Sequence, residues 1–327
     1  MYIQSDYRDV EPICYEEPHI ANVTKVIESN FEPYFGRYLN SKGGEMFSDD
    51  EFESLARKFG ASSVKRDKKN NTDDVYREII EQAISDYSKD RESYQKIFDA
   101  ELLEDYKEDT AMFKSVVLRN ECPIIRKTLA NKKAKELDGY RQDFNRANAK
   151  ELLAVVTNLN KFCRSYVEDY QEEKYEQSSN YKDLGLMDLS GEGYTYFGVI
   201  GAGIKSHMLY KVAPALFPNR SRNALWAMWY LTNKETFGCE TSSEFLMIDV
   251  TKDYFQQNYF YPYGLFAWYA FTLYKMLKNK VLQYGVNLDP EYRYVYVNSF
   301  LEYVAFEHRD AIDELKRKIK DGGRGYE

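Results

Sequence analysis

Residues 200–206 read Ile-Gly-Ala-Gly-Ile-Lys-Ser, and this stretch decides how the C-terminal half of the chain is interpreted. Gly201 and Gly203 allow the backbone to turn tightly without a side-chain clash. The apolar residues Met208 and Leu209 follow at a spacing typical of a helix that packs on a core. We therefore expect a glycine turn that leads directly into a helix.

The start of such a helix is suited to binding an anion. Its first peptide N–H groups have no partner inside the helix, and the positive end of the helix dipole lies behind them. Ser206 adds a hydroxyl donor, and Lys205 adds a full positive charge. The pattern therefore favours the binding of a phosphate group.

The charge around the turn supports the same interpretation. Residues 193–234 contain no Asp or Glu, in a chain of 327 residues with a formal net charge of -8. An acidic chain does not coat nucleic acid or membrane with its whole surface, so only a local basic surface is expected to bind DNA, and no membrane contact is expected. The candidate phosphate-binding residues are Gly201, Gly203, Ile204, Ser206, His207, Lys211, Asn219, Arg220 and Arg222.

The stretch resembles the helix-hairpin-helix element of DNA repair proteins. In that family, a hydrophobic-Gly-hydrophobic-Gly hairpin is followed by two variable residues, often a Ser or Thr, and an apolar helix. Ile200 to Ser206 and the helix through Leu209 match these positions. The resemblance implies a helix, hairpin and helix in sequence, with DNA held by contacts from backbone amides to phosphate.

The resemblance extends to the glycosylase branch of that family. Bifunctional members have a lysine two residues after the second hairpin glycine, and this lysine attacks the sugar C1′ and forms a Schiff base. Lys205 holds that position. The family also has an essential Asp at the start of the next helix, where this chain has Ser221 and no carboxylate before Glu235. The resemblance implies excision of a damaged or modified base, in repair or in defence against phage, and Asp249 is the candidate substitute carboxylate.

Other interpretations of the turn stay open. A Gly-x-Gly turn between packed helices needs no ligand, and a small anion or nucleotide also suits it. A dinucleotide site is disfavoured because Ser206 replaces the third glycine of GxGxxG. The missing Asp favours a non-catalytic DNA-binding or scaffold protein, and the aromatic C-terminal half offers a surface to a protein partner.

Further charged clusters are expected to be solvated. Residues 65–71 (KRDKKNN) form a basic loop. A second basic cluster is followed closely by acids, as on a solvated helix face. The spacing of the acids between Glu240 and Asp249, with Lys252, lacks the compact form of a metal nuclease. The second basic cluster comprises Arg126, Lys127, Lys132, Lys133 and Lys135.

The composition limits the class of protein. Hydrophobic residues make up 43% of the chain and charged residues 30%, which is typical of a globular protein. The four cysteines have no CxxC or other close ligand spacing, so neither a zinc site nor another cofactor is expected. Scattered cysteines and a polar N-terminus predict a cytoplasmic protein. No apolar run reaches transmembrane length. The cysteines are Cys14, Cys122, Cys163 and Cys239.

Helical periodicity predicts a mainly α-helical fold. We expect a bundle-like helical region over residues 1–145 and a helical domain that carries the hairpin over residues 146–327. A helix over 20–39 is expected to break at Pro33, and a long helix is expected over 147–175. Asp289-Pro290 predicts a helix start, because an N-cap precedes Pro at the first helical position. Residues 237–250 suit either a short strand or a helical turn.

Overall fold

The computed structural model describes residues 10–41, 72–240, 244–249 and 255–322, and helices dominate these residues. The mainly α-helical fold is therefore confirmed. The α-helices are α1 (Glu17–Asn40), α3 (Thr72–Ser88), α4 (Arg91–Ile97), α5 (Ala100–Asp105), α6 (Thr110–Met112), α7 (Pro123–Ala130), α8 (Asp138–Arg146), α9 (Ala149–Glu168), α10 (Glu172–Glu176), α11 (Ala202–Val212), α12 (Arg222–Leu231), α13 (Tyr263–Leu282), α14 (Arg293–Glu307) and α15 (Arg309–Gly322).

Shorter elements connect these helices. A π-helical segment, η2 (Phe113–Glu121), leads into α7. The 3-10 helices are η1 (Pro12–Tyr15), η3 (Lys135–Leu137), η4 (Met187–Ser190), η5 (Glu192–Tyr194) and η6 (Pro290–Tyr292). Within the described residues, the strands β1 (Met247–Asp249) and β2 (Phe255–Gln257) form one antiparallel pair, with Met247 opposite Gln257. Residues 247–249 within the ambiguous stretch over 237–250 thus form a strand.

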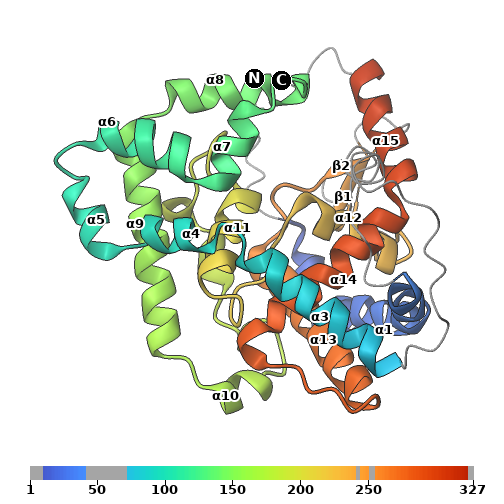
Figure 1. The fold of residues 1–327 in the computed structure, drawn as a ribbon. Helices are drawn as coiled ribbons and strands as arrows, with labels where there is room; N and C mark the ends of the chain where they lie inside the picture. Colours follow the sequence, from blue (N-terminus) through green and yellow to red (C-terminus); the bar gives the residue numbers. More distant parts are fainter. Residues whose placement is uncertain (1–9, 42–71, 241–243, 250–254, 323–327) are drawn as a thin grey trace, which may run out of the picture.

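Helix α11 lies at the centre of the molecule, between two groups of helices (Figure 1). Helices α4, α7 and α9 pack against it on one side, and α12 packs on α14 in the other group. The buried apolar side chains of both groups belong to one continuous core. Helix α1 lies against α12, α13 and α14, far from it in sequence. The domain boundary expected at residue 145 stays a prediction.

The expected break of the first helix at Pro33 is wrong, because α1 runs unbroken from Glu17 to Asn40. Pro33 lies on the exposed face of α1, as does Ser29, four residues earlier. The carbonyl that loses its helical partner therefore faces solvent, where water satisfies it. The core face, which includes Ile27 and Phe31, stays in register on both sides of the proline.

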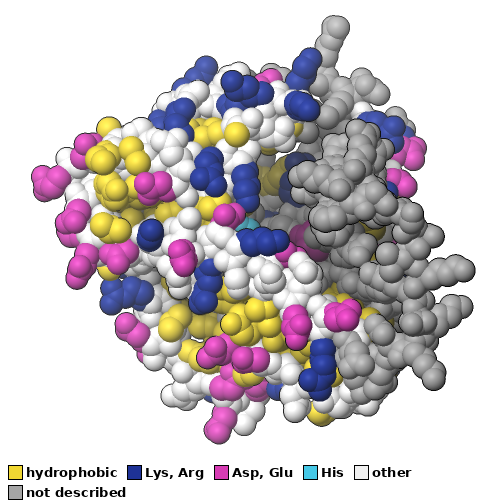
Figure 2. Space-filling model, viewed as in Figure 1, with side chains coloured by type: hydrophobic (Ala, Val, Ile, Leu, Met, Phe, Trp, Pro, Cys, Tyr) yellow, Lys and Arg dark blue, Asp and Glu magenta, His cyan; other side chains and the backbone are white. Residues whose placement is uncertain are grey.

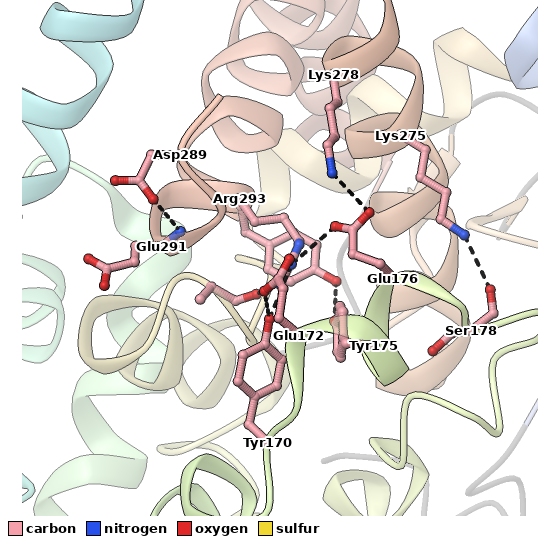
Figure 3. A network of polar contacts seen from close by, with 12 residues as sticks. Tyr170, Glu172, Tyr175, Glu176, Ser178, Lys275, Lys278, Asp289, Glu291 and Arg293 are labelled. Atoms are coloured by element: carbon pink, nitrogen blue, oxygen red, sulfur yellow. Dashed lines mark hydrogen bonds and ion pairs between the residues drawn. The ribbon is translucent and has the colours of Figure 1, made fainter. Parts of the chain in front are cut away.

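The expected long helix over 147–175 is also wrong, because α9 ends at Glu168 and α10 begins at Glu172. The interruption lets Glu172 and Glu176 turn toward Arg293, whose side chain is completely buried (Figure 3). The guanidinium lies 2.8 Å and 3.3 Å from these two carboxylates and also donates to the carbonyl of Ala215. A buried cation needs such partners, so this network joins α10, α14 and the loop before α12.

The start signal at Asp289 is confirmed. Its side chain accepts a hydrogen bond of 2.9 Å from the backbone N–H of Glu291, and η6 leads directly into α14.

The aromatic helix α13 has a buried stripe with charged residues at its C-terminal end. No helix in the described part of the chain has the length and apolarity needed to cross a membrane.

Candidate functional site

A tight turn precedes α11. The backbone N–H and carbonyl groups of Tyr196 and Ile200 pair at 3.1 and 2.8 Å, and Gly198 occupies the turn with φ +81°. A Cβ atom at Gly198 would lie 2.5 Å from the carboxylate of Asp143, so glycine is required there. Gly201 then caps α11. The glycine pair therefore opens a helix after the turn is complete.

The helix that the resemblance implies before the hairpin is absent. Residues 187–194 form the 3-10 helices η4 and η5 instead. Lys205 and Asn158 hold this segment through hydrogen bonds to the carbonyls of Leu189 and Gly193. The order around the motif is thus 3-10 turns, a tight turn and a helix, and the expected order of helix, hairpin and helix is wrong.

The first turn of α11 is open to approach from outside. No side chain caps its N–H groups, and Gly203 is exposed. A Cβ atom at Gly201 would meet nothing within 4 Å, and one at Gly203 would come no closer than 3.8 Å to the carbonyl oxygen of Arg220. Packing therefore does not demand glycine at either position. Ile204 is half-buried and packs against the core.

Lys205 points into the protein and is 3% exposed. Its ammonium donates to the carbonyl of Leu189 and, at 2.8 Å, to the hydroxyl of Thr195. Burial, with the nearby charge of Arg220, lowers the pKa of Lys205 to about 8. Near that pH, a larger fraction of this amine is neutral than of an exposed lysine. A nucleophilic Lys205 would first have to leave its two acceptors.

Ser206 and Arg220 connect α11 to the loop before α12. The Ser206 hydroxyl accepts a hydrogen bond of 3.1 Å from the backbone N–H of Arg220 and donates to the carbonyl of Gly203. The Arg220 guanidinium is buried and donates to the carbonyl of Asn258 at 2.8 Å. Burial lowers the pKa of Arg220 to about 10. Both predicted phosphate ligands are therefore engaged within the protein.

Lys211 and His207 lie on the side of α11 that faces α3 and α4. The buried Lys211 ammonium donates to the carbonyls of Tyr87 and Lys89. Burial lowers the pKa of Lys211 to about 8 and that of His207 to about 4. The imidazole packs edge-on against Tyr94, with ring centroids 5.5 Å apart. His207 is therefore neutral at physiological pH and brings no positive charge to a phosphate.

A carboxylate does lie at the start of α12. Glu302 on α14 accepts hydrogen bonds from the Ser221 hydroxyl at 3.2 Å and from the Asn223 side chain at 2.6 Å. Burial raises the pKa of Glu302. One turn earlier on α14, Asn298 accepts a 3.0 Å hydrogen bond from the buried Asn219. Reasoning from the sequence missed Glu302, although Asn298 and Glu302 are polar residues spaced by four, on one face of a mostly apolar helix.

The predicted carboxylate, Asp249, lies at the end of β1. Its backbone N–H donates to the carboxylate of Glu244 at 2.6 Å. Arg222, in contrast, is exposed at the start of α12. The structure thus places Glu302, rather than Asp249, beside Ser221. Lys252 and the basic loop at 65–71 lie outside the described residues.

The second basic cluster forms a continuous part of the surface. Residues 119–150, which we call the basic segment, contain nine Lys or Arg and four Asp or Glu, a net charge of +5. Lys132, Lys133, Lys135, Arg146 and Lys150 are all exposed. Figure 2 shows Lys and Arg side chains gathered over α7 and α8 and toward the centre of this face.

The basic segment adjoins the turn before α11. The backbone N–H of Asn148, between α8 and α9, donates to the Tyr196 hydroxyl at 2.9 Å. Residues 193–234 carry five Lys or Arg and no acid, so the rest of the chain outside these two segments has a net charge of -18. Positive charge is therefore concentrated in two segments that meet in the fold.

Comparisons with known proteins add no family to this geometry. No protein-family model matches the chain, and nothing among curated proteins or solved structures matches it.

Proposed function

We propose that the protein binds DNA through the phosphate backbone, with the basic segment as its main contact surface. The observation that carries this proposal is the exposure of the basic segment, with a net charge of +5, in a chain of net charge -8. Exposed Lys and Arg displace the counterions condensed on DNA, and this term supplies most sequence-independent affinity. A cytoplasmic location is part of the same proposal, and the contact with DNA in this account involves no cofactor.

The start of α11 supplies a second contact in this proposal. Its first turn has uncapped N–H groups beside two glycines that packing does not require. Such groups bind a phosphate without reading the base sequence. Exposed Arg222 adds a charge at the start of the next helix. In this account, α11 is held in place by the internal hydrogen bonds of Lys205, Lys211 and Arg220.

Salt-dependent binding tests the proposal. Fluorescence anisotropy with a labelled duplex is expected to give a negative slope of log affinity against log salt concentration. Replacing Lys132, Lys133 and Lys135 together by Gln should reduce that slope by about 2.7 if each contacts one phosphate. The matched control replaces the exposed residues Lys25, Lys182 and Lys318 by Gln and should retain the slope. Equal slopes for both triple variants, or no binding at low salt, would overturn the proposal.

Base excision is a second candidate function. It is favoured by the lowered pKa of Lys205 and by Glu302 at Ser221, where glycosylases that the motif resembles have an essential Asp. In this proposal, the neutral amine of Lys205 attacks the sugar C1′ as the bond from C1′ to the base breaks, and the base leaves with one amine proton. The second amine proton moves to O4′ as the C1′–O4′ bond opens, which gives the Schiff base. The Glu302 carboxylate stabilises the developing positive charge on the sugar.

Borohydride trapping on an abasic duplex separates the two functions. A catalytic protein forms a covalent adduct that is lost in Lys205→Ala, weakened in Glu302→Gln and retained in the exposed-site control Lys161→Ala. DNA binding without any adduct would exclude the lyase reaction and leave the binding function intact. A base-release assay on duplexes that carry modified bases then tests for excision that proceeds without a Schiff base.

A further inference from the structure

Three buried donor groups meet far from the basic segment in sequence. Cys14 in η1, His19 in α1 and Cys239 after α12 each offer one ligand atom, and these atoms all lie within 4.8 Å of one another. The two sulfur atoms are 3.4 Å apart. Cys14 and Cys239 are 225 residues apart in sequence, so the fold alone brings them together.

The surroundings of this cluster hold unsatisfied polar groups. His19 is 5% exposed, and neither of its ring nitrogens has a hydrogen-bond partner in the described part of the chain. The buried hydroxyls of Tyr261 and Tyr269 interact with each other and lie within electrostatic range of both thiols. Buried polar atoms rarely lack partners, so the two ring nitrogens of His19 beside two thiols point to a ligand-binding site.

The geometry points to a zinc ion bound by Cys14, His19 and Cys239, and we propose this as a metal site of the protein. Two thiolates bound to one tetrahedral zinc ion are about 3.8 Å apart, given Zn–S distances near 2.3 Å. The observed separation of 3.4 Å is close to that value and much longer than the roughly 2.0 Å of a disulfide. Two thiolates and an imidazole are donors that zinc prefers.

Binding of the ion would release the two thiol protons to solvent and join the N-terminal segment to the loop after α12. A second contact already marks this junction: the Glu11 carboxylate accepts hydrogen bonds of 2.9 and 3.1 Å from the backbone N–H of Glu240. Three protein ligands leave one position of a tetrahedral zinc site for a further ligand. Burial of all three ligands assigns the ion to holding the fold together.

Metal analysis of the intact, unmodified chain tests this proposal directly. Elemental mass spectrometry of protein purified without chelators should find one zinc ion per chain. After removal of zinc and addition of Co²⁺, the wild-type protein should show visible d–d bands of tetrahedral Co²⁺ and a thiolate-to-cobalt charge-transfer band. Both measurements use the wild-type protein, so they do not depend on the folding of a variant.

Variants then assign the ligands. Cys239→Ser and His19→Ala should each lower zinc content at least tenfold, whereas Cys163→Ser, which changes another buried cysteine outside the cluster, should retain it. Wild-type protein without zinc and without cobalt bands would overturn the proposal. A mass lower by two hydrogens, restored by a reductant, would show instead that Cys14 and Cys239 form a disulfide.

Discussion

Two parts of this chain are basic in sequence, and the fold treats them in opposite ways. In residues 193–234, Lys205, Lys211 and Arg220 are buried and bonded mainly to backbone carbonyls. In the basic segment, lysines such as Lys132 and Lys133 are exposed. Positive charge in a sequence therefore does not indicate positive charge on the surface.

The difference follows from the helices that carry the charges. Helices α11 and α12 are apolar on most sides, and residues 224–231 of α12 are all buried. Lys205 and Lys211 on α11 are therefore buried and need carbonyl acceptors there, whereas Arg222 at the first position of α12 stays exposed. The basic segment instead consists largely of short helices at the surface, where long side chains keep their charged ends in water.

The largest expected effect concerns the most deeply buried cation. Arg293→Leu should lower the free energy of unfolding by about 3 kcal/mol, because the carbonyl of Ala215 loses its charged donor and the partly exposed Glu172 and Glu176 lose their buried partner. Urea denaturation measures this change. The control is Arg164→Leu, whose exposed ion pair with Glu168 spans 4.0 Å and should contribute no more than about 1 kcal/mol. Equal effects would remove the distinction between buried and exposed cations.

A smaller effect is expected at Ser206. Ser206→Ala removes the acceptor of the Arg220 backbone N–H and should cost about 1–3 kcal/mol, the penalty for an unsatisfied buried donor. Thermal and urea unfolding measure it. Ser165→Ala, at an exposed position of α9, is the matched control and should change stability little. An unchanged free energy of unfolding in Ser206→Ala would show that this hydrogen bond does not hold the loop before α12.

The pH dependence of stability tests the burial of Lys205. Its pKa of about 8 in the folded protein lies below the value of roughly 10.4 in an unfolded chain. Between these values, the unfolded state binds a proton that the folded state does not, so the contribution of Lys205 to stability rises with pH. The stability of the wild type relative to Lys205→Met should rise by about 2 kcal/mol from about pH 7.5 to 9.5.

The difference in stability between wild type and Lys205→Met isolates the contribution of this lysine. The tyrosines and cysteines titrate in both proteins, so their contributions cancel in the difference. The exposed Lys161→Met serves as a second reference and should follow the wild type at every pH. A difference between wild type and Lys205→Met that stays constant with pH would contradict the burial of the ammonium group.

Local patterns predicted much of the fold. The helix start after Gly201 and the cap at Asp289 depend on neighbours within a few residues, and the structure confirms both. The break at Pro33 was wrong because a pattern does not show which face meets solvent. The end of α9 was not predicted because Arg293, which pairs with Glu172 after the interruption, lies more than a hundred residues away in sequence.

The candidate site was less predictable. The glycine pattern located a helix start. The burial of Lys205, however, depends on its contacts with Leu189 and Thr195, and counting charges along the sequence does not reveal these contacts. Glu302 reaches Ser221 from another helix, 81 residues along the chain. The cysteine and histidine cluster was missed for the same reason, since spacing rules detect only ligands that are close in sequence.

Amine labelling with and without DNA tests the central comparison most directly. An amine-reactive ester, followed by mass spectrometry of peptides, reports the exposure of each lysine. We predict that Lys127, Lys132, Lys133 and Lys135 are labelled in the free protein and protected by a DNA duplex, while Lys205 stays unlabelled in both states. Labelling of Lys205 in the free protein and its protection by DNA, with the basic segment unchanged, would contradict the account.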